Sequence, residues 1–254
     1  MLMQITCLVI GFVLLIKGAD IFVEGASKVA SKLNIPPIVI GLTIVAFGTS
    51  APEAAISITS ALSGNVDLAV GNIIGSNIMN VLLILGISGC IARLKVKKNT
   101  YRYEIPFVMV ITLILLILGK FGESIDRFDG VVLWILFLMF LYYLYRLVKK
   151  GEEVPIDEVE EVGAKDTLLR LFIMIIIGIA AIVIGSDMTI DAAVYIAKVI
   201  GISQRLIGLT IIAFGTSLPE LVTSMTAAWK GKSDLAIGNI VGSNIFNILF
   251  VLGT

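Results

Sequence analysis

Charged side chains are scarce in this sequence, and histidine is missing altogether. Asp, Glu, Lys and Arg make up 15% of the 254 residues, whereas hydrophobic residues make up 58%. A soluble domain carries about a quarter charged residues. Together with a mean hydropathy of +1.04, this composition excludes a soluble protein and indicates an integral membrane protein. The absence of histidine removes the commonest transition-metal ligand and the usual proton switch near neutral pH.

The sequence also contains few cysteines and has no net charge. The two cysteines, Cys7 and Cys90, lie in or beside apolar runs far apart in the sequence. We therefore interpret both as small buried hydrophobic residues, not as a disulfide or a metal-binding pair. The 19 basic and 19 acidic residues cancel, which argues against a nucleic-acid partner. We expect a monomer or weak oligomer surrounded by membrane lipid.

Eight apolar runs are long enough to cross a bilayer. They lie at about 3–27, 37–62, 67–91, 104–120, 128–148, 167–196, 205–229 and 234–253. The first run lacks a preceding charged segment and is interpreted as a membrane span, not as a cleaved signal peptide. Residues 149–166 are polar and acidic, and are expected to form an exposed linker. The acidic stretch within this linker, at 152–161, lacks the residue spacing of an EF-hand loop.

Two motifs occur twice at a constant offset of 167 residues. IGLTIVAFGTSAPE at 40–53 returns as IGLTIIAFGTSLPE at 207–220, and GNIIGSNIMN at 71–80 returns as GNIVGSNIFN at 238–247. Equivalent positions are five spans apart, and an odd number of spans forces the second copy to enter the membrane in the opposite direction. Inverted repeats of this kind are typical of secondary transporters.

The repeat predicts an all-α integral membrane protein built from inverted repeats of five-helix type with broken helices. We divide the chain into a first half at 1–148 with five spans, a cytoplasmic acidic linker at 149–166 and a second half at 167–254 with three spans. Two complete repeats would need ten spans, so eight of ten are expected in this chain and the second half is incomplete at its C-terminal end.

Basic residues predict the orientation of the spans. The connection after the third span is rich in Lys and Arg and is assigned to the cytoplasm by the positive-inside rule. Alternation from there places fourteen basic residues inside and four outside, namely Lys120, Arg127, Lys198 and Arg205. The N-terminus is therefore expected outside, with the protein in the cell membrane.

Each copy of the first motif should interrupt a span. Gly48 and Gly215 are expected to permit a turn, and Pro52 and Pro219 suit the start of a second half-helix. Irregular backbone in a membrane is tolerated only where it is buried or lines a cavity. Carbonyls released at such a break, including those of Ala46 and its copy Ala213, can face a cation.

Polar side chains collect around these breaks. Glu53 and Glu220 fall in the first turn of each restarted half-helix, where the helix dipole favours a negative charge. Thr49, Ser50, Thr216 and Ser217 offer hydroxyls that can cap that half-helix or bind an ion. Ser76 and Asn80 share a helical face, as do Ser243 and Asn247, and add neutral oxygens. An all-oxygen set suits hard cations such as Ca²⁺ and Na⁺.

Plainer interpretations of these residues exist. A single Gly-rich interruption is usually a kink or a close helix contact. A Glu inside the membrane, in contrast, is costly and indicates function. Two such Glu at matching breaks therefore favour a cation site. Asp20 and its copy Asp187 are interpreted as structural or entrance residues, with Lys17 as a partner for Asp20.

The motifs GTSAPE and GTSLPE, each followed by GNIxGSNIxN, resemble the two repeats of the sodium/calcium exchanger family, within the cation/calcium exchanger superfamily. The resemblance covers most of 18–86 and 185–253 and implies ten spans, an extracellular N-terminus and a cytoplasmic loop between spans five and six. It implies ion ligands at Ala46, Thr49, Ser50, Glu53, Ser76, Asn80, Ala213, Thr216, Ser217, Glu220, Ser243 and Asn247. Some relatives carry an acidic residue where this chain has Asn247.

The predicted function is Na⁺/Ca²⁺ antiport by alternating access at a two-carboxylate site, with Ca²⁺ and Na⁺ as substrates and no cofactor. Proton/calcium exchange and K⁺-dependent sodium/calcium exchange remain alternatives, as does a channel. An enzyme is not expected, because no exposed segment carries a nucleophile–base pair or a phosphate-binding loop.

Overall fold

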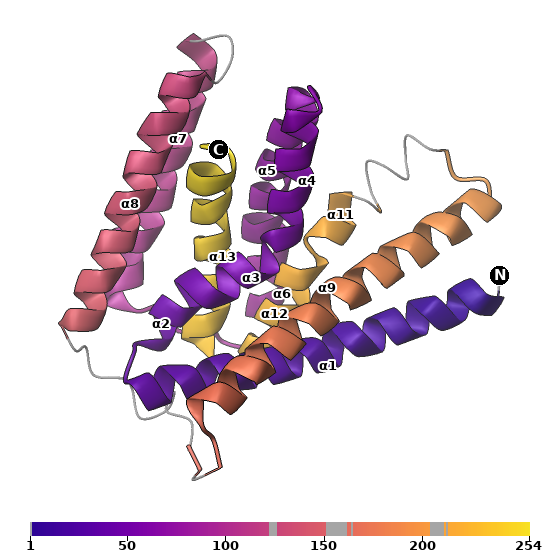
Figure 1. Ribbon diagram of the computed structural model, residues 1–254, viewed down its shortest axis with the longest axis horizontal. Helices are drawn as coiled ribbons and strands as arrows, with labels where there is room; N and C mark the ends of the chain where they lie inside the picture. Colours follow the sequence, from indigo (N-terminus) through magenta and orange to yellow (C-terminus); the bar gives the residue numbers. More distant parts are fainter. Residues whose placement is uncertain (1, 122–125, 151–161, 164, 204–210, 212) are drawn as a thin grey trace.

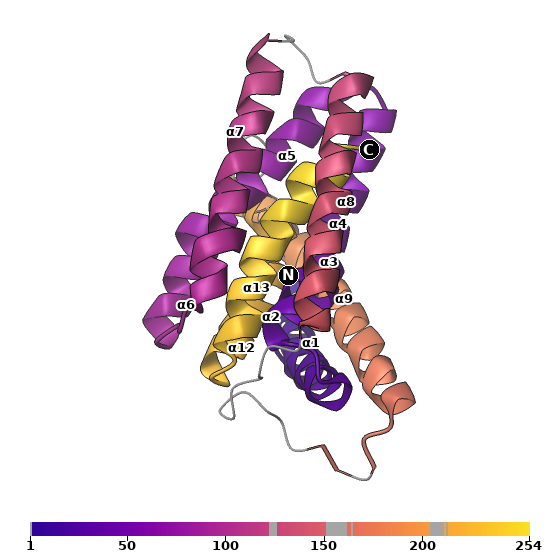
Figure 2. The same cartoon turned by 90° about the vertical axis from the view of Figure 1, so that its left-hand side faces the viewer.

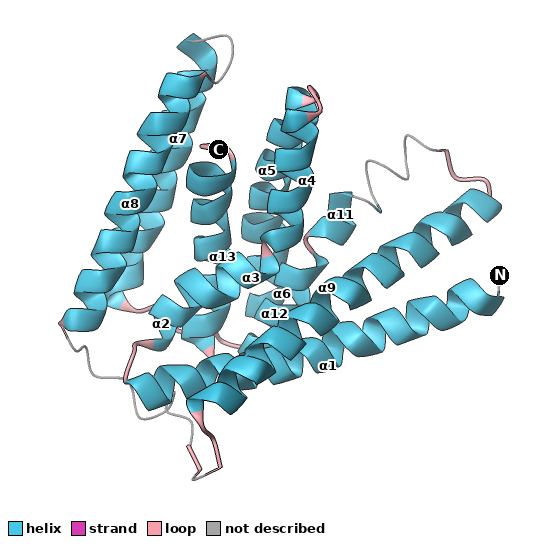
Figure 3. Ribbon diagram, in the orientation of Figure 1, coloured by secondary structure: helices cyan, strands magenta, loops and turns pink. Residues whose placement is uncertain are grey.

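The computed structural model describes residues 2–121, 126–150, 162–163, 165–203, 211 and 213–254. Every regular element among these residues is helical (Figure 3). With η denoting π-helical turns, the elements are α1 (Leu2–Leu33), α2 (Pro37–Ile40), η1 (Gly41–Val45), α3 (Ala46–Thr49), α4 (Ala51–Leu62), α5 (Val66–Met79), η2 (Asn80–Ile84), α6 (Leu85–Ile91), η3 (Thr100–Glu104), α7 (Ile105–Phe121), α8 (Arg127–Lys149), α9 (Leu168–Val199), α11 (Ala213–Thr216), α12 (Leu218–Trp229), α13 (Ser233–Ile245) and η6 (Phe246–Val251).

Seven of the eight predicted spans correspond to helices of sufficient length and apolarity. Six of them are unbroken, and the seventh is the pair Pro37–Thr49 and Ala51–Leu62, bent by 52° at its break. The remaining predicted span, 205–229, begins in residues outside the described part of the chain, so only α11 and α12 represent it. Most of the predicted linker lies outside the described residues too.

Equivalent helices of the two repeats end in the same way. Gly64 after α4 and Gly231 after α12 have positive φ angles of 82° and 73°. Each is followed by an amide that donates back across the helix end, from Asn65 to Ser60 O and from Lys232 to Ala227 O, both at 2.8 Å. This is the geometry of a helix stop that glycine favours because it carries no Cβ. The structural similarity of the two repeats therefore includes the turns that follow α4 and α12.

Helices α1 and α9 form a long antiparallel pair across the base of the molecule (Figure 1). Glycines on both helices make the close approach possible: a Cβ on Gly18 would lie 2.9 Å from Ala181 Cβ, and one on Gly185 would lie 2.7 Å from Gly11 O. Small residues at such a contact are how helices pack closely within a membrane. An antiparallel arrangement of equivalent helices is what an inverted repeat requires.

The remaining helices surround α13, which lies in the middle of the bundle (Figure 2). Nearly all of its residues from Ser233 to Ile245 are buried. Apolar side chains of α7, α8 and η6 close one side of it, with Ile111, Phe137 and Ile245 among the core residues. The helix that carries Ser243 is thereby enclosed within the bundle.

Charged residues predicted to be cytoplasmic gather at one end of the bundle. Lys28 on α1 and Arg170 on α9 both pair with Asp166, at 3.4 and 3.2 Å, and Lys97 pairs with Asp234 at the start of α13. The C-terminal ends of α1 and α8 lie at the lower end of Figure 1, and those of α6 and α12 at the lower end of Figure 2. The structure thus groups these residues as the positive-inside rule requires, and the compartment that this end faces stays a prediction.

Asp166 gives this end a measurable pH dependence. A hydrogen bond from the Gly163 amide (3.1 Å), together with Lys28 and Arg170, holds the pKa of the Asp166 carboxyl below its usual value. A lowered pKa stabilises the folded state above the unfolded pKa of about 3.9, and the contribution disappears as the pH falls through the folded-state pKa. Asp166→Asn should therefore lower the melting temperature at pH 7 and make no difference below the folded-state pKa. A melting-temperature difference that did not shrink on acidification would contradict this.

The burial predicted for the two cysteines is wrong. Both Cys7 and Cys90 are free, but they are not buried as expected: Cys7 is half-buried and Cys90 is exposed. An apolar residue can remain exposed in this way because lipid is the solvent of a membrane span.

Candidate cation site

Both copies of the first motif break a helix at the same residue type. The chain leaves helical geometry at Ser50 (φ −83°, ψ 7°) between α3 and α4, and at Ser217 (φ −90°, ψ 6°) between α11 and α12. Pro52 and Pro219 then occupy the first turn of α4 and α12, where a missing N–H has no consequence. The predicted breaks are thus present and equivalent.

The glycines of the motif have a different role from the one predicted. Gly48 and Gly215 lie within α3 and α11 and do not make the turn. A Cβ on Gly48 would lie 2.8 Å from Ile179 Cδ1, and one on Gly215 would lie 2.4 Å from Ile190 Cγ1. Their lack of a side chain lets α9 pack against the broken helices, while the serine that follows absorbs the change in direction.

Glu53 and Glu220 meet between the two repeats. Each is 1% exposed and lies in the first turn of its half-helix, α4 or α12. Ser50 donates to Glu220 Oε1 at 2.7 Å, and Ser217 donates to Glu53 Oε1 at 3.5 Å. The hydroxyls expected to cap these half-helices make no capping hydrogen bond; they reach across to the carboxylate of the opposite repeat instead.

A second group of polar side chains lies beside the carboxylates. Ser76 and Asn80 on α5–η2 are 4% and 1% exposed, and Ser243 and Asn247 on α13–η6 are 0% and 1% exposed. Asn80 is the first residue of η2 and Asn247 lies in η6, so each asparagine sits in a π-helical turn. Such turns occur frequently at functional sites because they displace side chains from the regular helical register.

The other predicted ligands are placed as follows. Thr49 and Thr216 are buried, and the Thr49 hydroxyl donates to Asn239 Oδ1 at 3.0 Å. The Ala46 carbonyl is not released as predicted, since it accepts from the Ser50 amide at 3.0 Å, although a carbonyl keeps a second lone pair. Ala213 is the first residue of α11, and its side chain lies outside the described part.

Five buried oxygens of the predicted ligands have no hydrogen-bond partner among the described residues. They are Glu53 Oε2, Glu220 Oε2, Asn80 Oδ1, Asn247 Oδ1 and Ser243 Oγ. Buried polar atoms are nearly always paired, so these five oxygens are candidates to bind a cation. In the described part of the chain no third acidic, His or Cys side chain joins the two carboxylates.

Four asparagines of the second motif have roles that the sequence pattern did not predict. Asn72 and Asn239 each donate to a serine on the neighbouring half-helix, Ser57 or Ser224, at 2.9 Å. Asn77 and Asn244 contact Asn247 and Asn80 of the opposite repeat. The sequence shows that these asparagines repeat at the offset of 167. Spacing alone, however, does not distinguish a residue that binds an ion from one that orients a neighbouring side chain.

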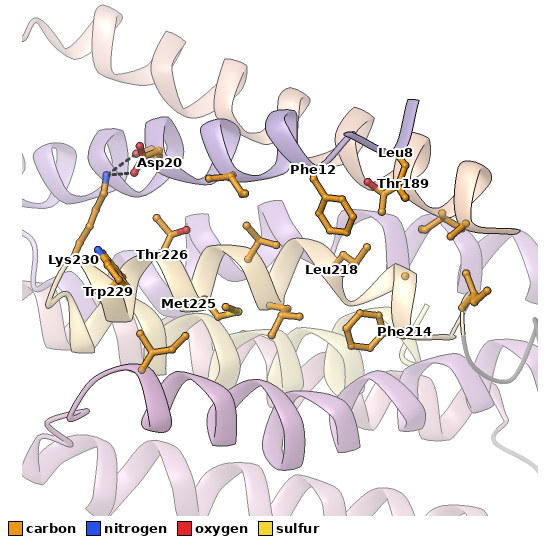
Figure 4. A pocket seen from close by; sticks show the side chains of 18 residues that line it. Leu8, Phe12, Asp20, Thr189, Phe214, Leu218, Met225, Thr226, Trp229 and Lys230 are labelled. Carbon is orange, nitrogen blue, oxygen red and sulfur yellow. Dashed lines mark hydrogen bonds and ion pairs between the residues drawn. The ribbon is translucent and has the colours of Figure 1, made fainter. Parts of the chain in front are cut away.

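A cavity of about 850 Å³ lies between α1, α9, α11 and α12, next to the second break. Its lining is apolar, with Phe12, Phe214, Leu218 and Met225 among the residues that face it (Figure 4). At one end Lys230 pairs with Asp20 at 2.7 Å. Lys230 on the turn after α12 thus replaces Lys17, the partner predicted for Asp20.

Comparison with known proteins identifies the family of this chain. The family model for the sodium/calcium exchanger protein matches residues 3–146 and 170–254. Inner membrane protein YrbG of Escherichia coli is 36% identical over 100% of this chain and 79% of its own length. The sodium/calcium exchanger MaX1 of Methanosarcina acetivorans is 30% identical over 97% of this chain and 80% of its own length.

A solved structure extends the likeness to three dimensions. The sodium-calcium exchanger NCX_Mj, soaked with Na⁺ and Ca²⁺, superposes with a TM-score of 0.84 at 33% identity, over 99% of this chain and 81% of the other. The chain therefore belongs to the sodium/calcium exchanger family, and is a membrane cation/calcium antiporter and not an enzyme.

Proposed function

We propose that this protein exchanges Ca²⁺ for Na⁺ at one site between Glu53 and Glu220, by alternating access. The observation that carries the proposal is the set of unpaired buried oxygens contributed by both repeats: two carboxylate oxygens, two amide oxygens and one hydroxyl. Hard oxygens and two negative charges suit Ca²⁺ and Na⁺. The names of similar proteins, MaX1 and NCX_Mj, support the same pair of ions.

Charge counting supports competition between the two ions. Two ionised carboxylates neutralise one Ca²⁺ or two Na⁺, so either load leaves the buried site near neutrality. A mixed load would leave a net positive charge in a medium of low dielectric constant, which is costly. Exclusion of one ion by the other is the basis of coupled exchange. A third Na⁺ would leave the same net positive charge, and it would make the exchange sensitive to voltage.

The α1–α9 pair is the part of the molecule suited to move. In this structure α12 packs against α1, with Ala227 and Ala228 both 1% exposed. The equivalent positions on α4 are less covered, and Ala61 is exposed. The end of α12 is thus more tightly covered than the end of α4, and the apolar cavity leaves space into which α1 and α9 can slide.

Transport by reconstituted vesicles tests the proposal. Vesicles loaded with Na⁺ and diluted into Na⁺-free medium should take up ⁴⁵Ca²⁺, and uptake should cease when the Na⁺ gradient is removed. Parallel samples receive K⁺ or a proton gradient. Uptake that needs K⁺ or follows the proton gradient alone would replace the Na⁺ assignment with the corresponding alternative, and single-channel currents would indicate a channel.

The Asp20–Lys230 ion pair yields a prediction about the two faces of the membrane. The offset of 167 relates Asp20 to Asp187 and Lys230 to Ser63. In the alternate state, in which each repeat adopts the conformation that the other has here, Asp187 would meet Ser63 and no ion pair would form. A partly exposed ion pair contributes up to about 1 kcal/mol, or roughly fivefold in an equilibrium. Asp20→Asn should shift the balance toward the alternate state by up to this factor.

The measurement is the apparent Ca²⁺ affinity from each side of oriented vesicles. Affinity should fall on one side and rise on the other. Glu24→Gln is the matched control, because Glu24 pairs with Lys28 within α1 and not across to α12. Equal changes on both sides in Asp20→Asn would argue against a role for the pair in access.

A further inference from the structure

Asn80 and Asn247 each face the candidate site with one end of a side-chain amide. Asn80 Nδ2 donates to Asn244 Oδ1 at 2.9 Å, and Asn247 Nδ2 donates to Asn77 Oδ1 at 3.1 Å. The oxygen ends, Asn80 Oδ1 and Asn247 Oδ1, are buried and have no partner among the described residues. From this geometry, and resting on the proposed function, we infer that Asn77 and Asn244 are positioning residues that turn the oxygen of each ligand amide toward the cation.

The two ends of an amide have opposite effects on a cation. The carbonyl oxygen accepts and can bind Ca²⁺ or Na⁺, whereas the NH₂ group carries positive hydrogens and repels either ion. The terminal torsion of asparagine is broad and roughly twofold, so the side chain itself does not prefer one orientation. Something outside the amide must therefore select the oxygen.

Asn77 and Asn244 make that selection because each presents an oxygen to the amide. An oxygen can only accept, so only the NH₂ end of Asn80 or Asn247 can face it. A flipped amide would bring two oxygens together and place NH₂ groups in the site. Asn77 is itself oriented, since its Nδ2 contacts the backbone carbonyl of Asn244 at 3.4 Å.

The arrangement is reciprocal between repeats. Asn77 of the first repeat holds Asn247 of the second, and Asn244 of the second holds Asn80 of the first. Both pairs obey the offset of 167. A network that only stabilised the bundle would satisfy donors and acceptors alike. Here the amide nitrogens of both ligand side chains have partners, whereas their oxygens have none, and one oxygen of each carboxylate is likewise unpaired among the described residues.

A double-mutant cycle tests the inference. Asn244→Leu keeps the size of the side chain and removes the oxygen that orients Asn80. Loss of an orienting partner typically costs 10–100-fold in metal affinity, so the Ca²⁺ KM should rise by about that factor with little change in maximal rate. A purely structural role would instead reduce the amount of folded protein and the maximal rate at an unchanged KM.

The second half of the cycle introduces Asn244→Leu into the Asn80→Asp variant. A carboxylate has an acceptor at both ends and needs no orientation, so adding Asn244→Leu to Asn80→Asp should change KM by less than about threefold. An equal KM penalty in both backgrounds would overturn the inference, as would a wild-type KM in Asn244→Leu. The mirror cycle, Asn77→Leu with Asn247→Asp, gives the same test if Asn244→Leu does not fold. Absence of Na⁺-driven uptake in the wild type would count against the proposed function and not against the amide orientation.

Discussion

Replacing either Glu53 or Glu220 by Gln is expected to abolish Na⁺-driven Ca²⁺ uptake. Both side chains are 1% exposed and contribute the only two carboxylates of the site among the described residues. Removing one member of a buried charge interaction costs about 3–5 kcal/mol, which corresponds to a loss of roughly 10²–10⁴-fold in Ca²⁺ affinity. A Gln at either position would also place an NH₂ group where a carboxylate oxygen now lies unpaired.

The measurement is ⁴⁵Ca²⁺ uptake and direct Ca²⁺ binding by purified protein, each compared with the wild type. Asp67→Asn is the matched control because Asp67 is an exposed acid at the start of α5, outside the site, and its replacement should leave both values unchanged. Uptake at the wild-type rate in Glu53→Gln or Glu220→Gln would refute the assignment of that carboxylate as an ion ligand.

Gly178→Val should destabilise the folded protein by forcing α1 and α9 apart. A Cβ at this position would lie 2.7 Å from Phe22 Cβ and 2.8 Å from the Phe22 backbone nitrogen, so the two helices would have to separate. Overpacking of this kind costs about 1–3 kcal/mol. For a protein of this size the melting temperature should fall by roughly 2–12 °C. Transport should fall as well, because α1 and α9 would no longer move as one unit.

Gly119→Val provides the comparison for this prediction. Gly119 lies on α7 within another membrane-spanning helix, and a Cβ there would meet nothing within 4 Å. Both variants replace a helical glycine by valine, and they differ in whether another helix lies against the new side chain. If Gly119→Val lowered the melting temperature as much as Gly178→Val, the effect would arise from helix propensity and not from the α1–α9 contact.

Much of this architecture follows from the sequence because the repeat makes each feature appear twice. The break before Pro52 and Pro219, the burial of both Glu residues and the shared faces of Ser76 with Asn80 and of Ser243 with Asn247 are all where the motifs predict them. In a membrane the backbone must satisfy its own hydrogen bonds, so a polar interruption of an apolar run has few possible structures.

Contacts between the repeats could not be predicted in the same way. Serine is a common N-cap residue, and Ser50 stands at an N-cap position. Its hydroxyl nevertheless donates to Glu220, because the half-helices of the two repeats face each other. Asp20 has a Lys three residues before it, but Lys230 reaches it from 210 residues away. Local spacing contains no information about which distant helix end arrives at a given side chain.

The division of the site between the repeats also constrains how the protein is made. A chain synthesised only as far as residue 148 already contains Glu53, Ser50 and Asn80, but it lacks Glu220 and Asn244, with which Ser50 and Asn80 form hydrogen bonds. Until α12 and α13 enter the membrane, these polar groups have no partner from the second repeat. The first half alone therefore cannot form the proposed cation site, which needs residues of both repeats.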